Sequence, residues 1–157
     1  MPTIYIQTPI GIAKIVGDSN GISELKVLDD EVNISTEIPN ELIGAVSQFK
    51  DYFEGKRTDF SIKTNVKGTV FQQKVWQELS KIPYGKTISY LDMAKKLGDP
   101  KTIRAAASAN AKNPLWILVP CHRVIGSKGC LTGYAGGLWR KQWLLQHEST
   151  SKQQTLF

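Results

Sequence analysis

The sequence predicts an α/β protein in two parts, a small N-terminal α/β lobe followed by a mainly helical C-terminal domain. The first third of the chain consists of short β-branched runs separated by turn residues, a pattern typical of strands. From Thr69 onward, apolar residues recur instead at the spacing of helix faces. A basic connector, Lys63–Gly68, separates the two patterns. We therefore expect domains at residues 1–66 and 67–150, followed by a polar tail at 151–157 with little reason to fold.

The N-terminal lobe is predicted to contain three strands and a helix. The turn Asp18–Gly21 suits a tight hairpin, because its Asn-Gly pair supplies positive φ. A helix is expected from Pro39-Asn40 to Gly55, a typical stop residue, and Thr58–Ile62 is compatible with one more strand. No catalytic cluster is present, so the lobe is interpreted as a scaffold. Its predicted strands are Thr3–Gln7, Ile10–Val16 and Ile22–Leu28.

The C-terminal domain is predicted to begin with a helix capped by Thr69 and ended by the turn Ile82–Gly85. Ser89 is the expected N-cap of a second helix, which Gly98-Asp99-Pro100 breaks. A third helix then covers Lys101–Lys112. The residues expected to face the core are Val70, Phe71, Val75, Trp76 and Leu79 in the first helix, and Leu91, Ala94 and Leu97 in the second.

The two short helices on either side of Gly98–Pro100 form a helix-turn-helix pattern. The second carries Arg104 among small residues, including Ala105 and Ser108, so its surface is slim enough to enter a DNA groove. An ordinary helical hairpin packed on its alanines is the alternative. Because residues 63–112 hold ten Lys/Arg and three Asp/Glu, we favour DNA binding.

The charge of the chain is concentrated in its second part. Net charge is +6, but residues 1–62 hold five Lys/Arg against ten Asp/Glu, whereas residues 63–157 hold fifteen against four. This asymmetry favours a polyanionic partner, although a solvated basic surface is the alternative. With two cysteines, no signal-peptide pattern and no apolar run near the roughly 20 residues of a membrane span, we expect a cytoplasmic protein with free thiols and no membrane partner. A monomer is also expected.

The stretch Pro120-Cys121-His122-Arg123-Val124 carries the candidate chemistry. The preceding apolar run, Leu115–Val119, predicts a buried strand that stops before the proline. A thiolate is a nucleophile, and His122 or Arg123 is a candidate for activating Cys121, whereas a buried and inert cysteine is the alternative. Neighbouring side chains on a strand face opposite ways, so a turn at Cys121 or a bridging water must bring the thiol and imidazole together.

Glu148 is the candidate third member of a nucleophile–base–carboxylate relay, because it lies beside His147 at the expected end of the last helix. The packing of that helix is assigned to Leu138, Trp139, Trp143, Leu144 and Leu145. A metal site is disfavoured by count and spacing, since the Cys and His residues are only Cys121, Cys130, His122 and His147. No cofactor is expected.

These motifs together resemble the O6-alkylguanine-DNA alkyltransferase family (methylated-DNA–protein-cysteine methyltransferases). Pro120–Val124 matches the family's active-site motif, and Tyr52–Lys56 resembles the end of its N-terminal domain, which implies ribonuclease H-like strands plus a helix in the first lobe. The match covers most of the chain, most strongly residues 69–148. The other matching stretches are Ile82–Tyr90, the Arg104 helix, Asn113-Pro114, Leu131–Gly137 and Trp143–Glu148.

The resemblance implies one irreversible transfer of an alkyl group from O6 of guanine in double-stranded DNA, with O4-alkylthymine as a further substrate. Cys121 would accept the group, His122 would act as base through a water, and Glu148 would orient His122. Asn113 would support the turn, Arg104 would fill the gap left by a base flipped from the minor groove, and Tyr90 would help to rotate it and protonate the leaving guanine. The implied substrate and DNA contacts also include Ala105, Ser108, Arg123, Val124, Tyr134, Ala135 and Gly136.

Other functions are weighed against this one. A thiol hydrolase would use Cys121 and His122 but would leave the Arg104 helix unexplained. A lesion-binding module of the alkyltransferase-like kind lacks the cysteine that is present here, and a helix-turn-helix regulator would not need the Cys-His pair. Trp116 is expected to pack in the core, although a side chain facing the pocket would exclude bulky adducts, and Cys130 is interpreted as a bystander.

Overall fold

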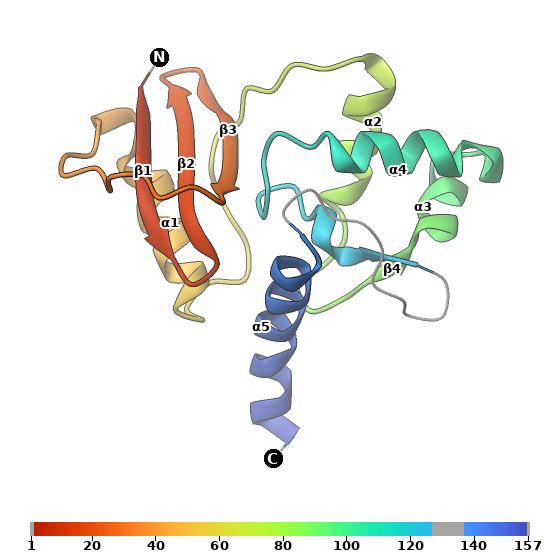
Figure 1. Cartoon of the computed structure of the whole chain (residues 1–157). Coiled ribbons are helices and arrows are strands. Elements are labelled where there is room, and N and C mark those ends of the chain that lie inside the picture. The colour runs from red at the N-terminus through yellow and green to blue at the C-terminus, as the bar shows by residue number, and fades with distance from the viewer. Residues whose placement is uncertain (1, 127–136, 157) are drawn as a thin grey trace. The chain divides into compact units, whose positions relative to one another are not determined.

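The structure, a computed structural model, describes residues 2–126 and 137–156, with the side chains of the last helix described up to Ser149. The chain divides between Lys67 and Gly68 into two compact units (Figure 1). The predicted fold class is confirmed, since the first unit combines strands with helices and the second is mainly helical. Among the described residues, no helix combines the length and the apolar character needed to cross a membrane.

The first unit is an antiparallel sheet with a helix against it. Strands β1 (Thr3–Thr8), β2 (Gly11–Asp18) and β3 (Gly21–Leu28) pair in the order β1-β2-β3, which confirms the three predicted strands. Alternate residues of each strand are buried, and the 3₁₀ turn η1 (Asn40–Leu42) with helix α1 (Ile43–Phe53) covers the apolar face (Figure 1). The buried face of α1 consists of Ala45, Val46, Phe49 and Tyr52.

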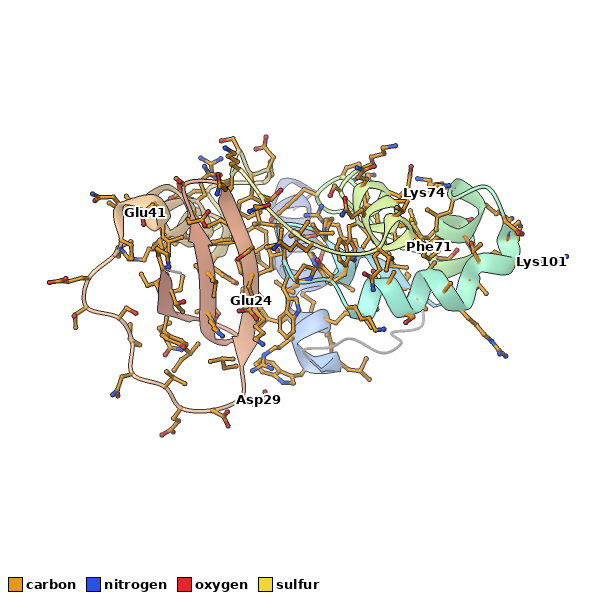
Figure 2. All side chains as sticks on the ribbon, turned by 90° about the horizontal axis from the view of Figure 1, so that it is seen from above. Glu24, Asp29, Glu41, Phe71, Lys74 and Lys101 are labelled. Atoms are coloured by element: carbon orange, nitrogen blue, oxygen red, sulfur yellow. The ribbon has the colours of Figure 1, made fainter. Side chains whose placement is uncertain are left out.

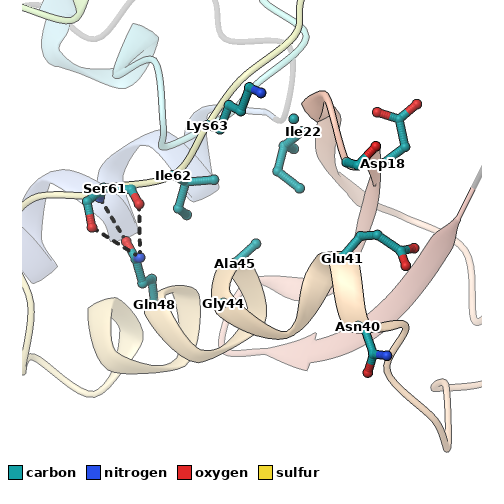
Figure 3. Close-up of a pocket in the computed structure, with 12 residues that line it drawn as sticks. Asp18, Ile22, Asn40, Glu41, Gly44, Ala45, Gln48, Ser61, Ile62 and Lys63 are labelled. Carbon is teal, nitrogen blue, oxygen red and sulfur yellow. Dashed lines mark hydrogen bonds between the residues drawn. The ribbon is translucent and has the colours of Figure 1, made fainter.

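The predicted strand at Thr58–Ile62 is wrong. The chain forms only an isolated bridge between Ile22 and Thr64, where Ile22 N donates to Lys63 O (2.9 Å). A glycine is needed at position 21, since its φ is +130° and a Cβ there would lie 2.8 Å from the Thr64 carbonyl carbon. The Gln48 side chain replaces a partner strand by accepting from Ser61 N at 2.9 Å, beside a pocket of about 480 Å³ (Figure 3).

The second unit is built from helices α2 (Val70–Leu79), α3 (Tyr90–Lys96), α4 (Ile103–Ala111) and α5 (Leu138–Leu156). The predicted caps are confirmed: Thr69 and Gln72 form a reciprocal capping box, and the Ser89 hydroxyl accepts from Asp92 N at 3.0 Å. A 3₁₀ turn, η2 (Pro100–Thr102), links α3 to α4, and both helices pack against α2. Trp76 Nε1 ties α2 to α4 by donating to Ala109 O (2.9 Å).

A pair of two-residue strands positions the candidate site. Strand β4 (Ile88–Ser89) runs parallel to β5 (Val124–Ile125), and the 3₁₀ turn η3 (Cys121–Arg123) leads directly into β5. This pairing sets Tyr90, the first residue of α3, beside the end of the Cys121 motif. Strands this short carry no periodic signal, so the sequence pattern did not predict them.

The predicted strand over Leu115–Val119 is also wrong, although all these residues except Leu118 are buried. The segment folds into tight turns: Leu118 N donates to Trp116 O (2.8 Å) around Ile117, whose φ is +75°. A β-branched residue in this region is strained, and it persists only where surrounding contacts impose it. Trp116 is 9% exposed, as expected for core packing.

Several predicted faces and ends need correction. Val70 and Leu91 are exposed at the first turns of α2 and α3, where Met93 takes the buried place expected for Leu91. Leu138 and Trp139 are likewise exposed at the start of α5. The polar tail is not separate, because α5 continues to Leu156; residues 138–156 contain neither Gly nor Pro to stop a helix.

Candidate active site

Cys121 is the first residue of the 3₁₀ turn η3, so it lies on a turn and not on a strand. Cys121 and His122 have exposed fractions of 3% and 0%. Because both lie on a 3₁₀ turn, their side chains need not face opposite ways as they would on a strand. Cys121 N donates to Val119 O (2.7 Å) across Pro120, which fixes the entry of the chain into this turn. The thiol is buried and is not part of a disulfide.

Glu148 reaches η3 from α5 and holds two residues of the motif. Its Oε2 lies 2.7 Å from His122 Nε2, and Arg123 donates to both carboxylate oxygens, from Nε at 2.8 Å and Nη2 at 2.9 Å. Arg123 Nη1 also donates to Ile82 O (2.7 Å), and the guanidinium lies over the Tyr84 ring. A buried two-pronged ion pair therefore ties α5, η3 and the turn after α2 together.

The electrostatics of this cluster fix which nitrogen of His122 is basic. Burial raises the pKa of Glu148, but hydrogen bonds and charges from His122 and Arg123 hold it well below its usual range, so the carboxylate is ionised. Burial lowers the pKa of His122 despite Glu148, and Arg123 and Lys141 lower it further, so the imidazole is neutral near neutral pH. A neutral ring facing a carboxylate donates from Nε2, which leaves the lone pair on Nδ1. Within the described residues, Nδ1 has no hydrogen-bond partner.

Asn113 braces the turns that precede Cys121. Its side chain is 4% exposed and makes three hydrogen bonds to backbone. Nδ2 donates to Leu115 O (3.2 Å) and Val119 O (2.8 Å), and Oδ1 accepts from Leu115 N (2.9 Å). These bonds satisfy backbone groups that a neighbouring strand would otherwise satisfy, and this explains why the apolar run forms turns instead of a strand.

We expect Asn113→Ala to destabilise the protein by about 3 kcal/mol, because it leaves buried backbone groups without partners. Urea denaturation followed by circular dichroism measures this free energy. The matched control is Asn65→Ala at an exposed position of the first unit, for which a change within about 0.5 kcal/mol is expected. Equal effects at the two positions would contradict the bracing role of Asn113.

The comparisons with known proteins identify the family. Residues 1–66 match the family model described as "6-O-methylguanine DNA methyltransferase, ribonuclease-like domain". Residues 70–150 match the one described as "6-O-methylguanine DNA methyltransferase, DNA binding domain". The chain belongs to the 6-O-methylguanine DNA methyltransferase family. This confirms the resemblance predicted from Pro120–Val124 and the accompanying motifs.

Relatives and solved structures of this methyltransferase family agree along nearly the whole chain. A methylated-DNA–protein-cysteine methyltransferase of Mycolicibacterium paratuberculosis is 44% identical over 147 residues, which cover 91% of this chain and 89% of the relative. The crystal structure of the Mycobacterium tuberculosis O6-methylguanine methyltransferase is 40% identical, with a TM-score of 0.84 and coverage of 94% and 92%. A structure of the M. tuberculosis protein in complex with DNA is 42% identical, with a TM-score of 0.84 and coverage of 93% and 91%. The enzyme class predicted from the sequence is the one these relatives are named for.

The residues predicted to contact DNA in this methyltransferase differ in their burial. Arg104, Ala105 and Ser108 are exposed on α4, and Tyr90 is half-buried at the start of α3. Val124 is buried on β5, and Arg123, which the sequence placed in the DNA-contact group, is 6% exposed and bound to Glu148 and Ile82, so it supports the site from within. The other predicted contacts lie outside the described residues; they are Tyr134, Ala135 and Gly136. Cys130, interpreted as a bystander, and residues 131–136 of the matching stretch also lie outside them.

The labelled side chains of Figure 2 illustrate the uneven charge of the chain. Glu24, Asp29 and Glu41 lie on the first unit, whereas Lys74 and Lys101 lie on the second. The lysine Lys74 also donates to Leu97 O (3.1 Å) at the C-terminal end of α3, where a cation complements the helix dipole. The surface of the second unit therefore suits an anionic partner.

Two polar residues near the thiol were not predicted. Asn110, 5% exposed on α4, places Nδ2 3.5 Å from both Tyr90 Oη and Cys121 O, at the limit of a hydrogen bond. Lys141 on α5 has no exposed surface, and its Nζ lies 5.7 Å from the centre of the Tyr90 ring. In the sequence, neither residue differs from an ordinary polar residue on a helix surface. For Lys141, the spacing could have indicated its place, because it lies two helical turns before Glu148 and so on the same face of the helix.

The described residues offer no ready place for a metal ion. In residues 2–126 and 137–149, no three His, Cys, Asp or Glu side chains gather in a way that could hold one. The site is therefore described by its protein groups: a buried thiol, a neutral imidazole, an ionised carboxylate and two buried cations, Arg123 and Lys141.

Proposed function

We propose that this protein repairs alkylated DNA by taking the alkyl group from O6 of guanine, or O4 of thymine, onto Sγ of Cys121. The observation that carries the proposal is the buried Cys121 turn whose His122 is oriented by an ionised Glu148. Membership of the methyltransferase family supplies the reaction class. The family's ribonuclease-like unit remains interpreted as a scaffold.

In the proposed reaction, His122 Nδ1 takes the thiol proton through a bridging water, because Nε2 already donates to Glu148. The thiolate attacks the alkyl carbon, a sulfur–carbon bond forms, and the carbon–O6 bond breaks. The guanine leaves as an anion and takes a proton from Tyr90 Oη. The product is a thioether with no good leaving group, so each molecule reacts once and needs no cofactor.

Access to O6 requires the base to leave the duplex, because a buried thiol cannot reach an atom inside stacked and paired bases. We propose that α3 and α4 act as a helix-turn-helix, with the small exposed residues Ala105 and Ser108 entering the minor groove. Arg104 fills the gap left by the flipped nucleotide, and Tyr90 presses on the neighbouring phosphate. The basic second part of the chain supplies the non-specific attraction to DNA.

The experiment is intact-mass measurement after incubation with duplex DNA containing O6-methylguanine, with a parallel duplex containing O4-methylthymine. We expect one added methyl group, mapped to Cys121 by peptide analysis, and no product beyond one equivalent. Cys130→Ser should react normally, whereas Cys121→Ser should not react. Repeated turnover would indicate a hydrolase, and binding without modification would indicate a lesion-binding module.

A further inference from the structure

Asn110 is a buried polar side chain that the reaction described above does not use. It lies with Ala106 and Ala109 on the buried face of α4, and its exposed fraction is 5%. Within the described residues, its Oδ1 is buried and has no hydrogen-bond partner. A buried acceptor without a partner costs free energy, and an apolar side chain of similar shape would avoid that cost. Packing alone therefore does not explain an asparagine at this position.

The carbonyl group of Cys121 fixes the orientation of the Asn110 amide. Nδ2 of Asn110 lies 3.5 Å from Cys121 O and 3.5 Å from Tyr90 Oη, at the limit of a hydrogen bond. A backbone carbonyl oxygen can only accept, so the amide turns its NH₂ group, and not Oδ1, toward Cys121. The two hydrogens of Nδ2 are then directed at two acceptors, Cys121 O and Tyr90 Oη. One amide on α4 thus contacts both the turn that carries the thiol and the first residue of α3.

This arrangement restricts the direction of the hydroxyl proton of Tyr90. The NH₂ group of an asparagine is a donor and not an acceptor. Tyr90 Oη therefore accepts from Asn110 Nδ2 and cannot donate to it, so the hydroxyl proton points away from Asn110. In the reaction proposed above, this is the proton that the leaving guanine takes. The asparagine thus favours the hydroxyl orientation in which that proton is available to another group.

We propose that Asn110 is a positioning residue whose Nδ2 holds the Tyr90 hydroxyl so that its proton is delivered to the leaving guanine. This rests on the proposed function, in which Tyr90 protonates the guanine. As the carbon–O6 bond breaks, Tyr90 Oη gives its proton to the guanine anion and becomes a phenolate; the proton that His122 took from the thiol then restores the phenol through solvent. A hydrogen bond to an ionised oxygen is shorter and stronger than one to a neutral hydroxyl. The Nδ2 contact, long at 3.5 Å, therefore tightens as the alkyl group is transferred.

The contact with Cys121 O suggests an alternative role, in which Asn110 only holds the turn that carries the thiol. The test must separate the two roles. Cys121 O also accepts from Val124 N, so this oxygen keeps a partner when Asn110 is replaced. An apolar replacement also removes the buried Oδ1 that has no partner among the described residues. The stability of the protein should therefore not fall when Asn110 is replaced by an apolar residue.

The test uses two alkyl donors that differ in whether the leaving group needs a proton. Iodoacetamide alkylates a thiol and releases iodide, a stable anion, whereas free O6-benzylguanine releases guanine; neither donor requires DNA. In a Cys130→Ser background, Cys121 is the single thiol, and its alkylation is followed by intact mass at neutral pH. Asn110→Leu removes the amide and keeps a similar branched shape. The matched control is Asn65→Leu, the same change at an exposed position of the first unit.

For Asn110→Leu we expect the single-turnover rate at saturating O6-benzylguanine to fall about tenfold or more, because proton donation to the leaving group is impaired. The donor concentration that gives half the maximal rate should stay within about threefold, since the lost hydrogen bond acts mainly in the transition state. The iodoacetamide rate should also stay within about threefold, because iodide needs no proton. The midpoint of urea denaturation should not fall, and Asn65→Leu should match the wild type throughout. An equal loss with both donors would show that Asn110 holds the thiol turn and would overturn the proposal.

A double-variant cycle tests whether Asn110 acts through Tyr90. Tyr90→Phe removes the hydroxyl, so adding Asn110→Leu should slow benzyl transfer by less than a further twofold or so. A larger further loss contradicts action through Tyr90. Asn110→Ala serves as a second variant, and loss of folding in both would show a packing role and overturn the proposal. A wild-type protein that accepts neither a benzyl nor a methyl group refutes the proposed function, whereas normal benzyl transfer by Asn110→Leu refutes only the role of Asn110.

Discussion

Glu148→Gln is expected to lower the free energy of unfolding by about 3–5 kcal/mol, because it leaves the Arg123 guanidinium buried without its anion. Glutamine preserves the size of the side chain, so the loss reports on charge and not on a cavity. Urea denaturation at neutral pH measures it. The matched control is Glu54→Gln, which removes the exposed pair with Lys56 and should cost less than about 1 kcal/mol.

The same variant should change the pH dependence of stability. In the wild type, the folded-state pKa of Glu148 lies below its ordinary value of 4.5 and that of His122 below 6.5. Both groups bind protons more readily in the unfolded chain, so stability is full above these values and falls as the pH drops through about 6.5 and then below about 4.5. Glu148→Gln should lose most of the second decline. A variant with wild-type stability and the wild-type acid profile would show that the ion pair contributes little.

Arg104→Ala is expected to slow methyl transfer from O6-methylguanine in duplex DNA by roughly a hundredfold, while transfer from free O6-benzylguanine changes less than about threefold. The reason is that unstacking and unpairing a base cost a few kcal/mol, and an inserted side chain offsets part of that cost. Arg104 is suited to this role because it is exposed at the start of α4, next to the exposed Ala105. Single-turnover rates on the two substrates give the ratio directly.

Lys101→Ala is the charge-matched control, since it removes one exposed positive charge from η2, immediately before α4. It should weaken DNA binding on every sequence and reduce the slope of affinity against salt by about one charge. At saturating duplex DNA, it should leave the ratio of the single-turnover rates on the two substrates unchanged. Equal losses on duplex and free base for Arg104→Ala would contradict the proposed gap-filling role.

Where the sequence carried periodicity or cap chemistry, it predicted the fold closely. The alternation in the first three strands, Thr69 and Ser89 as N-caps, and the break at Gly98–Pro100 all depend on near neighbours in the chain. The wrong predictions concern segments whose local structure depends on side-chain contacts that the sequence pattern does not show. Leu115–Val119 looked like a strand because nothing in its composition shows that the Asn113 side chain will satisfy its backbone.

Some residues of the candidate site could be predicted from the sequence and others could not, again because some roles depend on contacts between residues far apart in the chain. Cys121 and His122 are adjacent in sequence, and Glu148 was notable as a carboxylate in a basic region. The role of Arg123 as a buried clamp depends on Ile82 and Glu148, which are 41 and 25 residues away in the chain. Lys141 looked like one more surface lysine, because burial of a charged residue is visible only once the helices are assembled.

Helix α4 determines how Arg104 stands with respect to the sulfur. It spans nine residues, so its length is about 13 Å, and its far end is fastened by Trp76 to Ala109 O before the chain turns to Cys121. The length of α4 and its rotation about its own axis therefore set the position of the surface residue Arg104 relative to the buried thiol of Cys121. Side chains along it can vary, but adding or deleting one residue would rotate Arg104 by about 100°. The length of α4 should thus be far less free to change than its composition.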